Sequence, residues 1–315
     1  MSAPVTAPAA AATSSGDAKS DFMKVFDDLV VQLGSDIATT HDMPQYAKEY
    51  IHKSMTYNVP HGKLTRGLAV LQCYKSFMSG MNQPVTPELA YQANLLGWCV
   101  EFLQAFFLVA DDIMDGSVTR RGQPCFFRLP EIGLKAVNDS LMLELMIYRI
   151  LRLNFRDHPS YIHFVELIQD VTYTTELGQL LDLTSQQQPG NTNFDSFNFD
   201  TLYRIYKYKT AYYSFYLSVA LGMRLAGVTD TMQYDVARKI CLAIGEYFQA
   251  QDDYLDCFGD PEVIGKIGTD IEENKCTWMV VTALQKCGYE KGGDSENVHA
   301  IEVLKGNYGR SEKEC

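Results

Sequence analysis

The sequence is short of long apolar runs and of paired cysteines, and each shortage excludes a class of protein. No apolar run approaches the roughly 20 residues that a bilayer-spanning helix needs, so we expect no transmembrane helix. The eight cysteines are scattered and include no C-x-x-C pair. In a chain of 315 residues this pattern is typical of reduced thiols in the cytoplasm, rather than of a disulfide framework or a zinc site.

Positive charge is also scarce, with 27 Lys and Arg against 39 Asp and Glu and a net charge of −12. A nucleic-acid surface needs clustered Lys and Arg to neutralise phosphates, so we expect no nucleic-acid partner. A single small anion can still be held by a few local cations. It can also be held by metal ions that the protein's own carboxylates collect.

Composition divides the chain into two parts. Residues 1–20 are rich in Ala, Ser, Thr and Pro and hold one lysine and no arginine, which predicts a disordered tail without a mitochondrial targeting role. Residues 21–315 show apolar positions at three- and four-residue spacing, no sustained two-residue alternation, and prolines between the apolar blocks. They predict one all-α domain with helices over 88–115, 139–155, 161–183, 200–227 and 231–257 and a loop over 186–193.

Two aspartate clusters with the pattern D-D-x-x-D carry the strongest chemical signal. They comprise Asp111, Asp112 and Asp115, and Asp252, Asp253 and Asp256. On a helix the first and last members lie on one face, where like charges repel. Gly116 and Gly259 predict that both clusters lie near helix C-termini, where the helix dipole adds to the repulsion. Carboxylate oxygens in this arrangement suit Mg²⁺ completed by water and substrate phosphate. Acidic clusters are often only solvated surface, but both clusters follow strongly apolar segments, and chance repetition of the pattern is improbable.

Basic residues at several places provide candidate diphosphate-binding groups. These are Lys63 and Arg66 in GKLTRG, which share a face if a helix begins there, Arg120 and Arg121 after the first cluster, Lys209 beside Thr210 in an aromatic segment, and Lys266 and Lys275 after the second cluster. Each is weak alone, because Lys and Arg are usually solvated. Together with two aspartate clusters they indicate a pocket with metal on one wall and cations on another.

Six strings, in order, resemble the trans-prenyl-diphosphate synthases, and within them the group that makes farnesyl diphosphate. They are GKLTRG (62–67), LQAFFLVADDIMDGSVTRRGQ (103–123), TELGQLLDL (175–183), YKTAYYSFY (208–216), FQAQDDYLDCFGD (248–260) and GKIGTDIEENKC (265–276). The resemblance covers about residues 25–310. It implies a single large helical bundle around a central cavity, a homodimer, and magnesium-dependent transfer in isoprenoid and sterol precursor synthesis. Terpene cyclases share the first cluster, but their second metal motif normally differs.

The resemblance also implies a role for each candidate residue. Asp111, Asp115 and Asp252 would hold about three Mg²⁺ ions, supported by Asp112, Asp253, Asp256 and Asp182. Arg120, Lys209, Lys266 and Lys275 would grip the allylic diphosphate, dimethylallyl or geranyl. Thr210 and Gln249 would orient dipoles toward the allylic cation. Lys63, Arg66, Gln104 and Arg121 would hold isopentenyl diphosphate, whose double bond attacks that cation to give farnesyl diphosphate.

Product length can be argued from helical spacing. Phe107 lies four residues before Asp111, and Phe106 five before, so a ring lies about one turn, roughly 5–6 Å, from the metal ligands. A tail anchored at the aspartates would grow toward these rings, which predicts a short product. The rings can equally be ordinary core aromatics, and a geranyl or geranylgeranyl product is the alternative.

Two segments depart from the family pattern. The family usually continues past the NYG at 307–309, so we expect this chain to lack its C-terminal helices, and residues 288–299 are expected to form an inserted loop. A truncated chain raises the alternative of a non-catalytic or regulatory paralogue. The complete aspartate clusters favour the enzyme.

Overall fold

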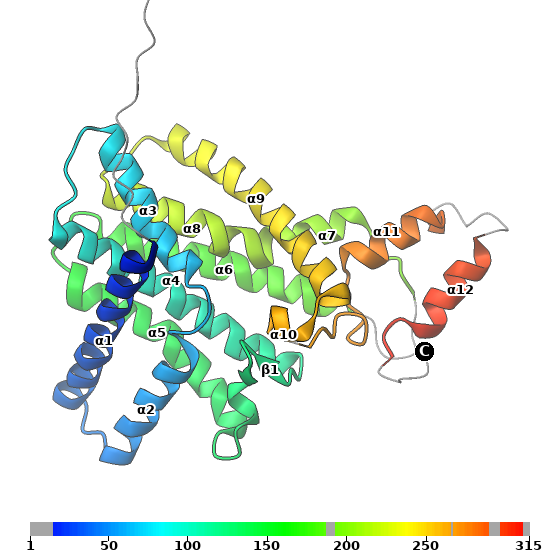
Figure 1. The fold of residues 1–315 in the computed structure, drawn as a ribbon, viewed down its shortest axis with the longest axis horizontal. Helices are drawn as coiled ribbons and strands as arrows, with labels where there is room; N and C mark the ends of the chain where they lie inside the picture. The colour runs from blue at the N-terminus through cyan, green and yellow to red at the C-terminus, as the bar shows by residue number, and fades with distance from the viewer. Residues whose placement is uncertain (1–14, 187–192, 266, 290–296, 311–315) are drawn as a thin grey trace, which may run out of the picture.

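The structure is a computed structural model that describes residues 15–186, 193–265, 267–289 and 297–310. It is almost entirely helical, as the apolar periodicity predicts (Figure 1). Its α-helices are α1 (Ser15–Thr40), α2 (Gln45–Asn58), α3 (Thr65–Gly80), α4 (Pro87–Met114), α5 (Ala136–Phe155), α6 (Tyr161–Ser185), α7 (Phe199–Ile205), α8 (Leu217–Leu225), α9 (Thr231–Phe258), α10 (Pro261–Ile264), α11 (Trp278–Lys286) and α12 (Val298–Asn307). The other elements are the 3₁₀ turns η1 (Phe126–Arg128) and η2 (Gly133–Lys135), the π-helix η3 (Tyr206–Tyr216) and the strands β1 (Thr119–Arg120) and β2 (Gln123–Pro124).

Helix α4 is the centre of the bundle and packs against α3, α5 and α8. It begins where Thr86 accepts a hydrogen bond from Leu89 N and Pro87 takes the first helical position, both favourable at a helix start. By length and composition α4 could cross a membrane, whereas the sequence led us to expect no such helix. However, 83% of its most apolar 18-residue stretch is buried inside the protein. Its apolar surface is therefore covered by the neighbouring helices.

The two aspartate clusters lie at the C-terminal ends of the two longest helices. Helix α4 ends at Met114, so that Asp115 caps it, and α9 ends at Phe258 just after Asp256. Gly116 follows the first cluster with φ +62°, a left-handed conformation that glycine adopts without steric cost. The sequence prediction that both clusters lie near helix ends is confirmed.

The predicted helix over 200–227 is helical as far as Leu225 but is not one α-helix. Its middle third, η3, is an 11-residue π-helix between α7 and α8, and it contains Lys209 and Thr210. π-Helices are rare and are frequently found at functional sites. Helices α6 and α9 pack on η3. Apolar periodicity predicts a helix here but does not distinguish this helix type.

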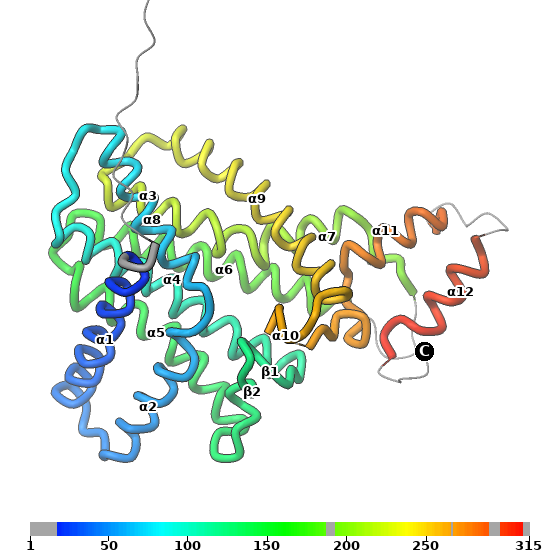
Figure 2. The backbone as a smooth tube through the Cα atoms, in the orientation of Figure 1, coloured from blue at the N-terminus to red at the C-terminus, as the bar shows by residue number. Residues whose placement is uncertain are grey.

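A short hairpin with a two-residue turn follows the first cluster. Arg121 and Gly122 join β1 to β2 with φ of +55° and +74°, the left-handed pair that a type I′ turn requires. Gly122 N donates to Gly265 O at 3.0 Å, so the turn of the hairpin lies beside the end of α10 (Figure 2).

The C-terminal helices α11 and α12 project from the bundle and have their own small core (Figure 1). Tyr308, Val280 and Leu284 pack there against Phe194 and Phe197. Two predicted boundaries are wrong. Helix α12 takes in residues 298–299 of the expected inserted loop, whose residues 290–296 lie outside the described chain. Helix α1 takes in residues 15–20 of the expected tail, since no proline interrupts it before the buried Phe22, whereas residues 1–14 are not described.

Candidate active site

A cavity of about 660 Å³ lies between the ends of α4 and α9. It is lined by Lys63, Arg66, Gln104, Phe107, Asp111, Asp115, Arg120, Arg121, Asp182, Lys209, Thr210, Gln249, Asp252, Asp253, Asp256 and Lys275, all of which the sequence predicted as site residues. The two aspartate clusters, about 140 residues apart in the chain, therefore share one hollow.

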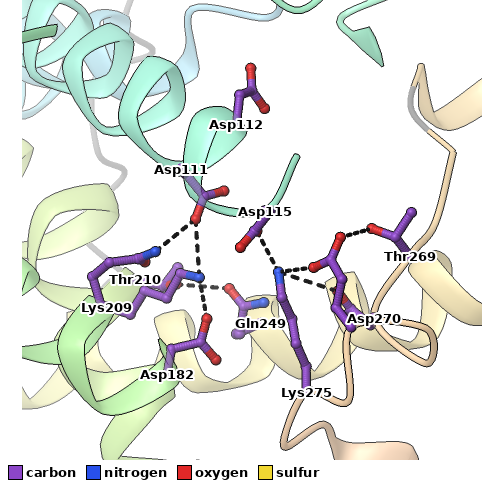
Figure 3. Close-up of polar contacts among 12 residues, drawn as sticks. Asp111, Asp112, Asp115, Asp182, Lys209, Thr210, Gln249, Thr269, Asp270 and Lys275 are labelled. Carbon is purple, nitrogen blue, oxygen red and sulfur yellow. Dashed lines mark hydrogen bonds and ion pairs between the residues drawn. The ribbon is translucent and has the colours of Figure 1, made fainter. Parts of the chain in front are cut away.

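Three predicted site residues are not part of this lining as described. Phe106 is buried in the core beside Phe107, with ring centroids 4.9 Å apart. Asp112 points away from the other site carboxylates (Figure 3), because it follows Asp111 by about 100° around the helix. Lys266 lies outside the described residues.

Asp111 sits in a set of direct contacts from α6 and η3 (Figure 3). Gln179 Nε2 donates to Asp111 Oδ1 at 3.0 Å, and Lys209 Nζ lies 3.4 Å from the same oxygen and 2.5 Å from Asp182 Oδ2. Burial by itself would raise the pKa of Asp111, but Lys209, Lys275 and Arg120 outweigh it and hold that pKa well below its usual range. Asp111 is therefore an ionised carboxylate in the physiological pH range.

Lys275 occupies the other end of the first cluster. Its Nζ lies 2.6 Å from Asp115 Oδ2 (Figure 3). The same Nζ lies 2.8 Å from Glu273 Oε2. Burial and the charge of Asp111 raise the pKa of Asp115 to about 6, although Lys275 and Lys209 oppose the shift. Two lysines thus neutralise the two cluster carboxylates that share the cavity face of α4. Cations are the partners that this acidic face requires.

Arg120 and Asp112 form a fork-like ion pair behind the cavity wall. Arg120 Nε and Nη2 both donate to Asp112 Oδ1, at 2.9 and 2.6 Å, and Nη2 lies 3.6 Å from Asp111 Oδ2. Arg120 lines the cavity, whereas Asp112 does not. The Asp112 carboxylate therefore holds a cation of the site, and its predicted support of the metal ions stays a prediction.

Asp253 is engaged by three donors from three elements. Its Oδ2 accepts from Trp278 N at 2.7 Å and from the Tyr206 hydroxyl, and its Oδ1 accepts from Gln249 Nε2 at 3.2 Å. Burial raises the pKa of Asp253 to about 6 despite these hydrogen bonds. Gln249 Oε1 in turn accepts from the Thr210 hydroxyl at 2.8 Å. The second cluster is thereby tied to η3 and to the start of α11.

Two glycines hold η3 between α6 and α9. A β-carbon at Gly178 of α6 would lie 2.6 Å from the Lys209 Cα, and one at Gly245 of α9 would lie 2.6 Å from the Ala211 Cα. Real β-carbons essentially never approach so closely. Only glycine allows the helices to come near enough to place Lys209 and Thr210 at the cavity.

The other predicted cations, Lys63, Arg66 and Arg121, also line the cavity. Arg66 Nε donates to Ser214 Oγ at 3.0 Å, and its guanidinium stacks over the Tyr213 ring at 5.1 Å. Lys63 lines the same cavity, but it precedes α3 and Leu64 has φ +55°, so the condition that Lys63 and Arg66 share a helical face is not met. Arg121 Nη1 donates to Asn58 O at 3.3 Å.

Several cavity residues were not predicted from the sequence. They are Glu101, Tyr213, Phe248, Thr175 and Tyr206. Glu101 is 3% exposed and accepts from Gly67 N at 2.8 Å. A single acidic residue within the apolar stretch of α4 was a signal that could have identified it. The aromatic residues carried no such signal, because aromatics at helical spacing usually pack in a core.

The oxygen donors of the site fit a magnesium ion whose coordination shell is completed by the substrate. Among the described residues no three His, Cys, Asp or Glu side chains form a closed metal-binding group. Mg²⁺ commonly binds one or two carboxylates plus waters and substrate phosphates, so pairs of carboxylates on two walls of one cavity are suitable. Asp111 and Asp115 on α4, and Asp252 and Asp256 on α9, provide such pairs around one cavity.

The family of the chain follows from its sequence. The profile of the family described as polyprenyl synthetase matches residues 48–305. The chain belongs to this polyprenyl synthetase family, which confirms the resemblance drawn from the six strings.

Particular relatives are farnesyl diphosphate synthases, also called farnesyl pyrophosphate synthases. The Kluyveromyces lactis enzyme is 45% identical over 300 residues, covering 95% of this chain and 82% of that protein. The Saccharomyces cerevisiae enzyme is 47% identical over 270 residues, covering 86% and 76%. The structure of T. brucei farnesyl diphosphate synthase complexed with a bisphosphonate matches with a TM-score of 0.86 and 35% identity, covering 94% of this chain and 83% of that one.

Proposed function

We propose that the chain is a farnesyl diphosphate synthase, which condenses isopentenyl diphosphate with dimethylallyl and then geranyl diphosphate in a magnesium-dependent reaction. The observation that carries this proposal is the shared cavity, where carboxylates from α4 and α9 face basic residues from four other segments. The relatives support the product class, since farnesyl diphosphate synthases match most of the chain at 43–47% identity.

Asp111, Asp115, Asp252 and Asp256 would hold Mg²⁺, about three ions per site, with Asp182 in support. When bound, the metal would neutralise the negative charge that develops on the departing diphosphate. Lys209 and Lys275 are already paired with these carboxylates, so they are placed to bind the same diphosphate once it arrives.

The remaining residues would orient the reactants. Arg120 would bind the allylic diphosphate with Lys209, Lys275 and Lys266, while Lys63, Arg66, Gln104 and Arg121 would bind isopentenyl diphosphate. The allylic C–O bond breaks and diphosphate leaves. The isopentenyl double bond then attacks the allylic carbon, and the released diphosphate accepts the proton that is lost. Thr210 and Gln249 would direct oxygen lone pairs toward the positive charge.

Phe107 would limit the length of the product. It lines the cavity one turn before Asp111, and its ring contacts Tyr213 edge-on with centroids 5.1 Å apart. Phe106 packs behind it. A chain anchored by its diphosphate at Asp111 would meet this pair of rings.

The experiment is a product assay on the purified chain. Isopentenyl diphosphate would be supplied with dimethylallyl or geranyl diphosphate, and products would be identified by chromatography after dephosphorylation. We expect farnesyl diphosphate, loss of turnover with a chelator and recovery with Mg²⁺. Asp111→Asn and Asp252→Asn should each lower kcat at least roughly 100-fold. Absence of condensation from both allylic substrates, or near-normal turnover of either variant, would contradict the proposal.

We also propose a cytoplasmic homodimer. The cysteines among the described residues are free thiols, as a reducing compartment allows. Leu141 and Leu145 of α5 and Leu177 and Leu180 of α6 are large apolar side chains that are 46–59% exposed. Such a surface favours a protein partner. Light scattering should give twice the mass of the chain, and Leu141→Glu with Leu145→Glu should give a monomer. A wild-type monomer at micromolar concentration would contradict this arrangement.

A further inference from the structure

The second cluster contains an aspartate whose contacts differ from those of a metal ligand. Asp253 is 5% exposed, and both its oxygens accept hydrogen bonds from protein groups: Oδ1 from Gln249, and Oδ2 from Trp278 N and the Tyr206 hydroxyl. These donors come from α9, α11 and η3. Three of the roughly four lone-pair positions of the carboxylate are therefore taken, and metal binding at Asp253 would compete with donors that join three elements of the fold.

These contacts fix the orientation of the Gln249 amide. An ionised carboxylate only accepts hydrogen bonds, so the end of Gln249 that meets Asp253 must be its NH₂ group. The Gln249 carbonyl oxygen is then turned toward Thr210, whose hydroxyl donates to it at 2.8 Å. Both Thr210 and Gln249 line the cavity. The charge on Asp253 thereby determines which end of a cavity amide is the acceptor.

The same carboxylate holds the start of α11. Trp278 is the first residue of that helix, and a negative charge at a helix N-terminus is favourable. Lys275 lies three residues earlier, and its Nζ is 2.6 Å from Asp115. A second contact fixes this segment, because the Tyr308 hydroxyl donates to Lys275 O at 2.7 Å. Movement of the α11 N-terminus would therefore move a cation of the site.

We infer that Asp253 is a positioning residue of the prenyl-transfer site, which orients the Gln249 amide and anchors α11, and not a ligand of the metal ions. The catalytic part of this inference rests on the proposed function, because only a prenyl-transfer reaction forms an allylic cation beside Gln249. An allylic cation is stabilised by acceptor oxygens directed at it, and a reversed amide would direct N–H groups there instead. Loss of the Asp253 charge should therefore slow the chemical step more than it weakens metal or substrate binding.

The test compares three variants with the wild-type enzyme. Asp253→Asn keeps the shape but presents an amide donor toward Gln249. Asp253→Asn combined with Gln249→Glu restores a donor and an acceptor in exchanged positions and keeps the net charge. Asp252→Asn is the matched control for loss of a metal ligand. Turnover is measured against Mg²⁺ concentration, binding of Mg²⁺ with methylenediphosphonate is measured by calorimetry, and amide exchange is followed across Trp278–Lys286.

We expect Asp253→Asn to lower kcat by roughly 100-fold, with KM values and the Mg²⁺ half-saturation changed less than about threefold. The affinity of Asp253→Asn for Mg²⁺ with methylenediphosphonate should stay near the wild-type value, whereas Asp252→Asn should weaken this affinity at least about tenfold. Exchange should become faster in α11 in both variants that carry Asp253→Asn, which lack the charge at the start of that helix, and should not change in Asp252→Asn. The double variant should recover at least about tenfold in kcat, since a partner exchange restores the hydrogen bond.

Two outcomes would overturn the inference. One is an Asp253→Asn variant that weakens Mg²⁺-dependent diphosphonate binding as much as Asp252→Asn does. The other is a double variant no more active than the single one, with unchanged exchange in α11. If the wild-type chain makes no prenyl product, the proposed function fails, but calorimetry and amide exchange still decide whether Asp253 binds metal or anchors the helix.

Discussion

Gly178 of α6 lies directly against the backbone of Lys209 in the π-helix, so closely that a β-carbon would be 2.6 Å from the Lys209 Cα. The ammonium of this lysine reaches both Asp111 and Asp182. The position of a central cation of the site therefore depends on the absence of one methyl group from a neighbouring helix.

Gly178→Ala should destabilise the protein and lower activity together. Overpacking of this kind costs about 1–3 kcal/mol and would displace η3, with Lys209 and Thr210. The matched control is Gly34→Ala in α1, where a β-carbon meets nothing within 4 Å and the better helix propensity of alanine should stabilise by up to about 1 kcal/mol. Urea unfolding and steady-state kinetics of both variants check this, and equal effects at the two glycines would contradict it.

Phe107→Ala should lengthen the product by at least one isoprene unit, because it removes the ring that lines the cavity below Asp111. Phe106→Ala is the informative comparison, since Phe106 is buried and not part of the lining. It should mainly cost stability, about 3–5 kcal/mol for a buried aromatic. Chromatography of dephosphorylated products decides between the two rings, and unchanged product length in Phe107→Ala would refute its limiting role.

Asp112→Asn should act through Arg120. The variant removes the negative charge that accepts the hydrogen bonds of Arg120, and a hydrogen bond to a charged group contributes about 1.5–3 kcal/mol. Arg120 would then be held less firmly, and the KM for the allylic diphosphate should rise by roughly tenfold. Arg120→Gln should raise it similarly, and the double variant should add little, since the two residues act as one unit. Kinetics of all three enzymes give the coupling. Strictly additive effects, or a changed Mg²⁺ half-saturation in Asp112→Asn, would argue for separate roles.

His158 should make stability depend on pH. Its burial lowers the pKa of the imidazole in the folded protein, and its Nδ1 accepts from Ser160 N at 3.0 Å. The native state therefore favours the neutral ring. The stability that this preference contributes is complete above about pH 6.5, the pKa of the imidazole in the unfolded chain. It is lost as the pH falls through the lower pKa of the imidazole in the folded protein.

His158→Phe tests the effect, because it keeps a ring against Phe155 and Phe164 but cannot titrate. The free energy of unfolding of wild type relative to this variant should fall between pH 7.5 and pH 5. Urea titrations at several pH values measure it. A difference that stays constant over that range would show that the imidazole does not contribute.

Much of this protein was determined locally by its sequence. The spacing of apolar residues gave five long helical segments, and glycine after the first cluster marked the end of α4. The i, i+4 positions of Asp111 and Asp115 follow from helix geometry alone, whatever the helix packs against. For the same reason the repeated acidic pattern could be assigned to a metal-dependent site before its walls were known.

Only the tertiary structure decided how the members of each cluster divide their tasks. Helical spacing places Asp112 and Asp253 about 100° from their neighbours, but the direction of the core, and so their contacts with Arg120 and Tyr206, depends on how whole helices are rotated in the bundle. The π-helix and the left-handed Leu64 were hidden for a related reason. Backbone periodicity is a local property, whereas the close approach at Gly178 is a contact between segments distant in the chain.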